Sequence, residues 1–474
     1  MKKEKKIEKN SIRNIKLSRC YRIFLFFIMI SIDCTLDISN GIISSASIEI
    51  KKHLKINNTE FGSFSTSVSI GKIISSFLFI LLNQKISRKW LIIICLMLHS
   101  FFLFCFKITD NVNILIIIFG LLGFTKTIPT IYIPVWINQF GHSEHKTVQI
   151  TSIQLFQSIG KIIGNLINLI FGYENWQNGF VISGCYLLFL SFCCLISNED
   201  YFSRSLHPKK IEKEIETKNF ENRISSTIFE DHNDNDNNNN NYKNEENNQE
   251  KKNYCSHFYL LLKNPLYIIS LTCGSIIRGL ISCLNYWYPD FLRNTLKEEQ
   301  FKLTIFYILV SLVGPFGGII ANWILKKYIG SYEGKKVSWP IVILHLISSF
   351  FAIGIGFMKS LFSVCIITIC YLIFNSTYLA LIQGIIISSV DKKLSATGFA
   401  FANACMQIIT GTTPIIYGMI NDKYKKKFPS FAMICIMSGN LLAVPLLILL
   451  AILRNKKFDE KDKNKENDIE LIEK

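Results

Sequence analysis

The chain has 474 residues, of which 49% are hydrophobic, 13% aromatic and 18% charged, and its formal net charge is +17. Apolar runs of about 20 residues, long enough to cross a bilayer, recur from Tyr21 to Leu453, which excludes a soluble globular protein. Lys and Arg gather in the tails, the central loop and the short connections, so the positive charge does not indicate nucleic-acid binding.

The first half of the chain contains six predicted membrane helices behind a basic N-terminal tail, residues 1–21. The first apolar stretch includes Asp33 and Asp37 and has no small-residue cleavage site after it, so we expect a retained helix rather than a signal peptide. The predicted spans of this half are Arg22–Ser47, Phe61–Leu82, Trp90–Phe106, Val112–Trp136, Thr147–Phe171 and Phe180–Ile196.

A polar segment, residues 197–256, separates the halves and has an Asn-rich centre at Asn233–Asn241. This composition cannot bury enough apolar surface to fold, so we expect a disordered cytoplasmic loop. The charged C-terminal tail, residues 454–474, is expected to be cytoplasmic and disordered as well. The spans between them are Pro265–Tyr288, Phe301–Leu325, Trp339–Met358, Leu361–Val390, Ser395–Ile420 and Phe431–Leu453.

Six spans, a long loop and six more spans predict an all-α integral membrane protein with twelve helices in two six-helix bundles, residues 22–196 and 257–453. Paired bundles of this kind are typical of transporters that bind a solute near the bilayer midplane, between the halves. Basic residues in both tails and in the central loop favour the cytoplasm for all three, although short loops near Lys51 and Lys423 are also basic. The sequon Asn57–Thr59 would then face outward. The sequence leaves open whether the membrane is the plasma membrane or a vacuolar or lysosome-like one.

Charges inside the predicted spans are the main site candidates, because each costs about 2.5–3.5 kcal/mol at mid-membrane unless it is paired or lines a watery cavity. Asp33 and Asp37 are four residues apart and share a helix face with Asn40 and Ser44. Two carboxylates this close resist simultaneous ionisation, which suits proton coupling. The cations, which would hold an anionic head group, are Lys72, Lys126, Lys161 and Arg278. The alternative is that these charges form structural ion pairs or reach the interface.

The eleventh predicted span has a polar face formed by Asn403, Gln407 and Thr410. This face would either line the cavity or hydrogen-bond to a neighbouring helix. No phosphate-binding Gly-rich motif or paired CxxC motif is present, and the eight histidines are scattered. We therefore predict no metal, no cofactor and no enzymatic activity.

Four stretches follow one another in a characteristic order: Thr35–Asp37, Gly120–Phe140, Asn285–Leu292 and Ser395–Asp422. They resemble the YLDR, GVGEA…APTIIADLF, WWAPxFL and RATAxA…GDxxSPxxxGxxSD patterns of the spinster branch of the major facilitator superfamily. The resemblance implies alternating-access transport. The spinster branch further implies an amphiphilic lipid, such as a lysophospholipid or a sphingoid compound, often moved with protons.

The sequence departs from this pattern at charged positions. The family's acidic and basic loop between helices two and three is reduced here to Arg88 and Lys89, and Asn322 stands at the corresponding acidic position of the second half. These three residues are the candidates for a conformational latch. An ungapped alignment places Lys126 at a family Glu, so we hypothesise that Lys126 pairs with Asp37.

The sequence therefore predicts a monomeric secondary active transporter for a small organic anion or a lysolipid-like solute. Asp33 and Asp37 are the candidates for proton coupling. The candidates for substrate binding are Lys72, Lys126, Lys161, Arg278, Asn403 and Gln407. The alternatives are a transporter for a sugar, a monocarboxylate or a drug, and a receptor or scaffold that does not transport.

Overall fold

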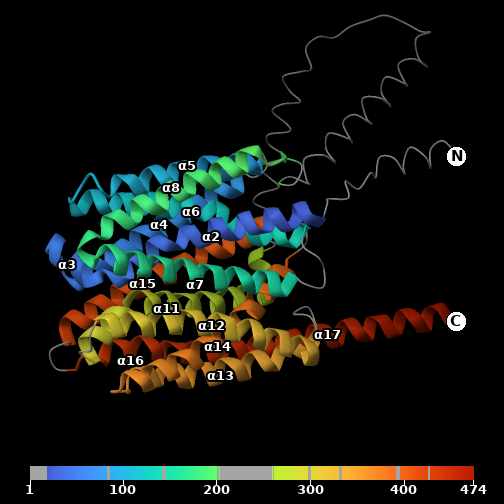
Figure 1. The fold of residues 1–474 in the computed structure, drawn as a ribbon. Helices are drawn as coiled ribbons and strands as arrows, with labels where there is room; N and C mark the ends of the chain where they lie inside the picture. Colours follow the sequence, from blue (N-terminus) through green and yellow to red (C-terminus); the bar gives the residue numbers. More distant parts are fainter. Residues whose placement is uncertain are drawn as a thin grey trace, which may run out of the picture.

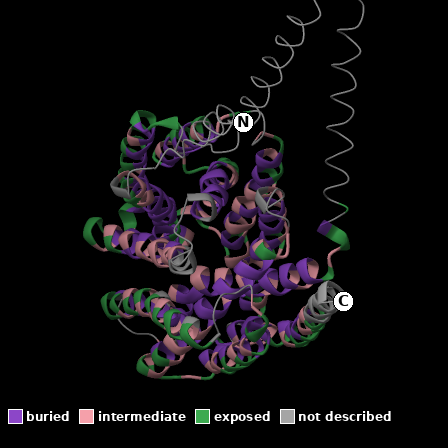
Figure 2. Ribbon diagram, turned by 90° about the vertical axis from the view of Figure 1, so that its right-hand side faces the viewer, coloured by how far each residue is buried: buried purple, intermediate pink, exposed green. Residues whose placement is uncertain are grey.

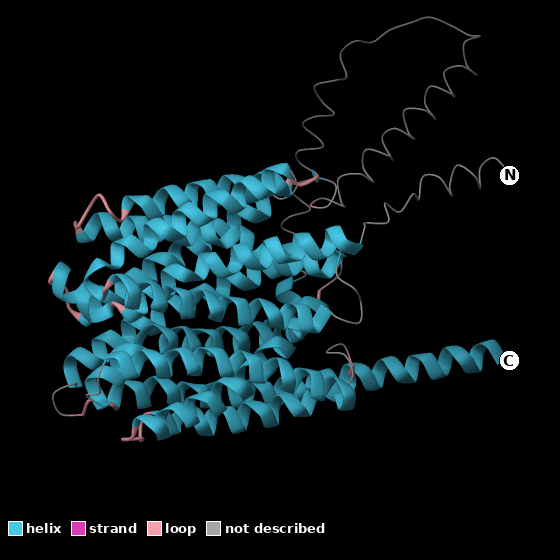
Figure 3. Ribbon diagram, in the orientation of Figure 1, coloured by secondary structure: helices cyan, strands magenta, loops and turns pink. Residues whose placement is uncertain are grey.

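The computed structural model describes residues 19–82, 86–140, 146–199, 202, 259, 261–296, 300–329, 334–390, 395–424 and 428–473. The described part is helical and contains no strand (Figure 3). The predicted basic tail up to residue 18, and residues 200, 201 and 203–256 of the predicted central loop, lie outside the described residues.

The helices of the two halves run side by side along the length of the molecule (Figure 1). The first half contains α2 (Arg19–Ser45), α3 (Ser47–Leu54), α4 (Asn58–Leu82), α5 (Arg88–Cys105), α6 (Val112–Phe140), α7 (Lys146–Phe171) and α8 (Trp176–Ile196). The second half contains α11 (Pro265–Leu296), α12 (Gln300–Ile329), α13 (Ser338–Ile355), α14 (Leu361–Ser388), α15 (Ser395–Tyr424), α16 (Phe431–Ser438) and α17 (Ala443–Glu473).

The predicted twelve membrane spans are confirmed. Within the described residues, 11 helical segments are long and apolar enough to cross a membrane, and the apolar part of α7, Leu155–Phe171, supplies the twelfth. The short helix α16 and the first part of the long helix α17, joined by a 3₁₀ turn, together form one of these spans, Phe431–Asp459. Exposed residues lie mainly on the outer faces of the bundle, where large apolar side chains meet lipid, and buried residues lie inside (Figure 2).

Close helix packing positions the residues of the cavity. A Cβ atom at Gly41 would lie 2.1 Å from the carbonyl oxygen of Lys161, and one at Gly160 would lie 2.0 Å from that of Cys34. Small residues thus let the backbones of α2 and α7 touch. As a result, Asp37 of α2 and Lys161 of α7 lie on facing helices.

The two halves meet mainly through α4 with α15 and α7 with α12. Thr66 of α4 donates a hydrogen bond to the carbonyl oxygen of Gly411 in α15 at 2.8 Å. Tyr173, just after α7, shares a hydrogen bond with Thr304 of α12 at 2.7 Å. These contacts tie the halves together at several depths.

Most ends of the predicted spans agree with the observed helices to within a few residues, but the seventh span was predicted to end at Tyr288 and α11 continues to Leu296. The first span ends at Ser45 rather than Ser47, and the chain then forms α3, a short helix that starts with Glu49 near its first turn and ends with Lys51, Lys52 and His53. This charge order complements the helix dipole and explains how so short a polar segment stays helical.

The C-terminal tail is also helical rather than disordered. Residues 454–473 continue α17 without a break. The membrane span directly before the tail supplies the helical nucleus from which the tail extends. In Figure 1 this extension leaves the bundle at the end where α2 begins.

The sequon is built into the start of α4. The Glu60 backbone N–H donates to the Asn57 side chain at 2.7 Å, and the Asn57 backbone N–H donates to the Glu60 carboxylate at 2.8 Å. This reciprocal pair is a capping box, and it satisfies backbone donors at the helix end.

Candidate functional site

A cavity of about 240 Å³ lies between the two halves. Its polar lining comes from five helices or more and from both sides of the molecule. From the first half it includes Asp37, Asn40, Lys72, Gln157 and Lys161, and from the second half Arg278, Asn285, Asn375, Gln383 and Gln407. The cavity therefore lies between the two halves, where a substrate site was predicted from the sequence.

Asp37 is held in a buried ion pair. The Lys126 ammonium lies 2.9 Å from an Asp37 carboxylate oxygen and donates to the Leu36 carbonyl oxygen at 3.0 Å. Asn40 donates to the same carboxylate oxygen at 2.6 Å. The structure thus contains the Asp37–Lys126 pair that the sequence suggested. Asp37 lines the cavity, whereas Lys126 is not among the lining residues.

Three other cations line the cavity: Lys72 of α4, Lys161 of α7 and Arg278 of α11. Within the described part of the chain, no carboxylate lies within ion-pair distance of any of the three. The only polar contact given for the Arg278 guanidinium is a weak one, 3.8 Å from the sulfur of Met406. Lys126, in contrast, has the Asp37 carboxylate as a partner in direct contact.

Asp33 lies behind the cavity wall. Its side chain is fully buried, and neither carboxylate oxygen has a close hydrogen-bond donor among the described residues. Its electrostatic neighbours are Asp37, Lys126 and Arg278, and the amide of Gln157 lies next to it. Although the sequence treats Asp33 and Asp37 as equivalent, the structure gives only Asp37 a cationic partner in contact.

The polar face of α15 divides between two roles. Gln407 and Thr410 line the cavity, but Asn403 does not. Asn403 instead donates to the Ser76 hydroxyl of α4 at 3.1 Å and accepts from Gln407 at 3.4 Å. The sequence left both readings of this face open, and each applies to part of it.

The three latch candidates lie elsewhere. The Lys89 ammonium donates to the carbonyl oxygens of Leu195 and Ser197, so it caps the end of α8 within its own half. Arg88 is buried in the first half, and Asn322 is buried in the second. The remaining residues of that loop, 83–85, lie outside the described residues.

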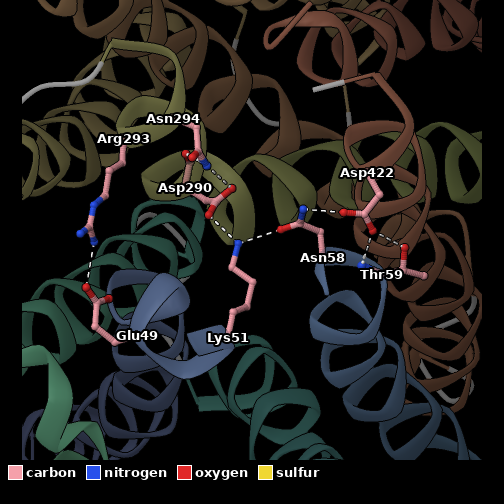
Figure 4. Close-up of polar contacts among 8 residues, drawn as sticks. All are labelled: Glu49, Lys51, Asn58, Thr59, Asp290, Arg293, Asn294 and Asp422. Atoms are coloured by element: carbon pink, nitrogen blue, oxygen red, sulfur yellow. Dashed lines mark hydrogen bonds and ion pairs between the residues drawn. The ribbon is translucent and has the colours of Figure 1, made fainter. Parts of the chain in front are cut away.

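A different set of contacts joins the halves at the end of the bundle where α3 lies (Figure 4). The Lys51 ammonium lies 2.7 Å from an Asp290 carboxylate oxygen and 2.7 Å from the Asn58 side-chain oxygen. It also sits 5.4 Å from the ring centre of Trp287, a cation–π distance. Arg293 lies 2.8 Å from Glu49.

Asp422, in the last turn of α15, completes this set. Its carboxylate accepts from the Asn58 amide at 2.6 Å and from the backbone and hydroxyl of Thr59 at 3.0 and 2.7 Å. We call the whole set the α3 clamp: Glu49, Lys51, Asn58 and Thr59 with Asp290, Arg293 and Asp422. It joins the two halves at the end of the bundle away from the start of α2 (Figures 1 and 4).

Sequence analysis missed the clamp and several lining residues. Asp290 stands within a motif-bearing helix, and a carboxylate there is a signal for a partner, but its partner is in a segment read as a loop. The uncharged lining residues Gln157, Asn285, Asn375, Gln383 and Tyr307 gave a weaker signal, since isolated amides and phenols are common in membrane helices.

The family model of the Major Facilitator Superfamily matches residues 24–414. No curated protein matches the sequence.

Solved structures share the fold. One is a bacterial homolog of the human lysosomal transporter Spinster, inward-facing and unoccupied, with 13% identity, a TM-score of 0.67, and coverage of 93% of this chain and 98% of that one. The occupied form of that homolog gives 12% identity, a TM-score of 0.61 and the same coverage of 93% and 98%. A D-xylose–proton symporter gives 12% identity and a TM-score of 0.62, with coverage of 90% and 97%.

Proposed function

The chain belongs to the Major Facilitator Superfamily, and from this premise we propose that it moves an organic anion across its membrane by alternating access through the central cavity. It is a multi-pass integral membrane transporter and not an enzyme.

The observation that carries the proposal is the set of three cations around one cavity. Lys72 and Lys161 come from the first half and Arg278 from the second. A structural tie would pair each cation with an acid, as Lys126 is paired with Asp37, because an unpaired charge inside a membrane protein is expensive. Cations without acidic partners in contact are suited to an anion that arrives from solution.

Apolar side chains complete the cavity wall and support an amphiphilic substrate. Phe64, Val68, Phe119, Leu372 and Leu379 all line the same space. An anionic head group among the cations and an apolar body against these side chains fit a lysolipid-like solute, as the resemblance to the spinster branch implies.

A second candidate is a neutral solute rich in hydroxyl groups, such as a sugar. Amides and phenols that donate and accept hydrogen bonds face the cavity from both halves, including Gln157, Asn285, Gln383 and Tyr307. A D-xylose–proton symporter shares the fold. The cavity cations favour the anion over this candidate.

Proton coupling is assigned to Asp33 in this proposal. Asp37 is held in its charged form by Lys126 and Asn40, and so it has little reason to take up a proton. Asp33 is enclosed and has no cation in contact among the described residues, so protonation removes a buried charge. Asp37 then positions Lys126 and helps to shape the cavity.

We also propose a monomer in which residues 22–196 and 257–453 form the two bundles. The end of the bundle where α2 begins, and from which α17 extends, would face the cytoplasm. The basic tails support this orientation. The α3 clamp then closes the opposite, outward side.

The experiment is uptake into proteoliposomes with an imposed pH gradient. The panel contains a labelled lysophospholipid, glycerol 3-phosphate, succinate and D-xylose. Lys72→Gln, Lys161→Gln and Arg278→Gln are compared with Lys359→Gln, which removes a charge from an exposed residue outside the cavity.

We expect the wild type and Lys359→Gln to take up the anion at similar rates, and the three cavity variants to take it up several-fold more slowly. Uptake of D-xylose alone would select the second candidate. Equal anion uptake by all variants would show that Lys72, Lys161 and Arg278 do not bind the substrate.

A further inference from the structure

The ionisable side chains at the cavity do not balance. Six of them are electrostatic neighbours: Asp33, Asp37, Lys72, Lys126, Lys161 and Arg278. Four are basic and two are acidic, so the fully ionised group has a net charge of +2. The imbalance lies at the cavity surface, because Lys126 is neutralised by Asp37 in direct contact.

Other acids of the described residues do not correct this imbalance. Asp37 is the one carboxylate that lines the cavity in the described part of the chain. The nearest acids of the second half, Asp290 and Asp422, are engaged in the α3 clamp with Lys51, Asn58 and Thr59.

Alternating access requires the cavity to pass through a state that is closed on both sides. In that state the excess positive charge is cut off from bulk water and its counterions, and unpaired charge in a low-dielectric interior is strongly unfavourable. An anion with two negative charges brings the group to neutrality. The loaded protein therefore changes conformation more easily than the empty one.

We infer that this protein is an anion exchanger, in which a dianion such as a phosphate monoester or a dicarboxylate must accompany each conformational change. The inference rests on the proposed function and adds the charge of the substrate and the way the carrier returns. Protonation of Asp33 cannot replace the returning anion, because it increases the excess positive charge. If a proton on Asp33 travels with the dianion, the loaded group keeps one positive charge, which is still less than the two of the empty, fully ionised group.

The test is an exchange assay in proteoliposomes with the membrane potential held at zero by potassium and valinomycin. Uptake of labelled glycerol 3-phosphate and of labelled succinate is measured into vesicles preloaded with the same unlabelled anion. It is also measured into vesicles loaded with chloride at equal ionic strength.

We expect uptake into preloaded vesicles to be at least about tenfold faster than uptake into chloride-loaded vesicles. A tenfold difference in rate corresponds to about 1.4 kcal/mol in the activation barrier, which is small beside the penalty for an unpaired buried charge. Butyrate, with a single charge, should not support exchange. Equal rates into preloaded and chloride-loaded vesicles would overturn the exchange mechanism and leave the proposed transport of anions intact. Exchange of butyrate as fast as that of succinate would overturn the requirement for two negative charges on the substrate. If no anion enters under either condition, the proposed function fails and the inference fails with it.

A charge-reducing variant gives a readout that does not depend on the amount of folded protein. Lys72→Met removes one positive charge from the cavity. The ratio of exchange to net uptake should fall several-fold in this variant and stay at the wild-type value in Lys359→Met. An unchanged ratio in Lys72→Met would show that cavity charge does not limit the return of the empty protein.

Discussion

Lys51 of α3 crosses from the first half of the molecule to the second and places its ammonium 2.7 Å from the carboxylate of Asp290, whose side chain is only 1% exposed. Phe61 and Trp287 surround the same ammonium at cation–π distances. The pair is therefore shielded from water, unlike most ion pairs at the ends of helices. It ties a short helix of one half to a membrane helix of the other.

The first prediction concerns this pair. Lys51→Gln leaves the Asp290 carboxylate buried without its cation, and breaking a buried pair in this way costs about 3–5 kcal/mol. We expect the closed end to open more often, so the backbone amides of α3 should exchange with deuterium faster. Lys52→Gln, on the same helix but exposed, is the control. Unchanged exchange in Lys51→Gln would mean that the pair does not hold the halves together.

The second prediction concerns Asp37 and Lys126. Lys126→Met strands the Asp37 charge, and we expect it to lower the free energy of unfolding by about 3–5 kcal/mol. The double variant Asp37→Asn, Lys126→Met should recover much of this loss, because no charge is left without a partner. Thermal unfolding in detergent is measured for Asp37→Asn, for Lys126→Met and for the double variant. Strictly additive losses would show that the two residues do not act as a pair.

The third prediction separates the two aspartates of α2. In the proposed coupling scheme, Asp33→Asn abolishes the effect of a pH gradient on uptake but leaves exchange at symmetric pH. Glu174→Gln, an exposed acid-to-amide change outside the cavity, should keep the gradient effect. Proteoliposome uptake with and without the gradient gives the comparison. A full gradient effect in Asp33→Asn would move the proton site away from Asp33.

The fourth prediction tests the contact between α2 and α7. A Cβ atom at Gly160 would meet the Cys34 carbonyl oxygen at 2.0 Å, so Gly160→Ala forces the two backbones apart. Overpacking of this kind costs about 1–3 kcal/mol. Gly354→Ala in α13 is the matched control, because the atom nearest to its added Cβ is 3.5 Å away. A melting temperature of Gly160→Ala equal to that of the control would argue against a tight α2–α7 contact.

Much of the fold followed from the apolar runs, because the thickness of a bilayer sets the length of a span. The α3 helix could not be predicted from the sequence, because eight residues with mixed charges resemble a loop when their partners are unknown. The helical C-terminal tail was missed for a related reason. Its composition predicts disorder, but a membrane span directly before it removes the difficulty of nucleating a helix.

Part of the candidate site was also visible in the sequence. Lys72, Lys161, Arg278, Asp37 and Gln407 all face the cavity, because membrane helices keep charges and amides away from lipid. The sequence did not show that Asn403 turns to Ser76 or that Asp33 lies behind the wall. Residues on the same face of one helix therefore differ in whether they face the cavity. The packing of the surrounding helices decides which of them does, and the sequence does not show that packing.

The unbalanced charge of the cavity has an electrical consequence. Whichever side is open is at the potential of the solution on that side, so a change of access carries the excess charge through the voltage drop of the membrane. One elementary charge crossing 100 mV gains or loses about 2.3 kcal/mol. In a membrane with a negative interior, the excess positive charge would lower the energy of an empty cavity open to the interior relative to one open to the outside, whereas the neutral, loaded cavity would show no such preference.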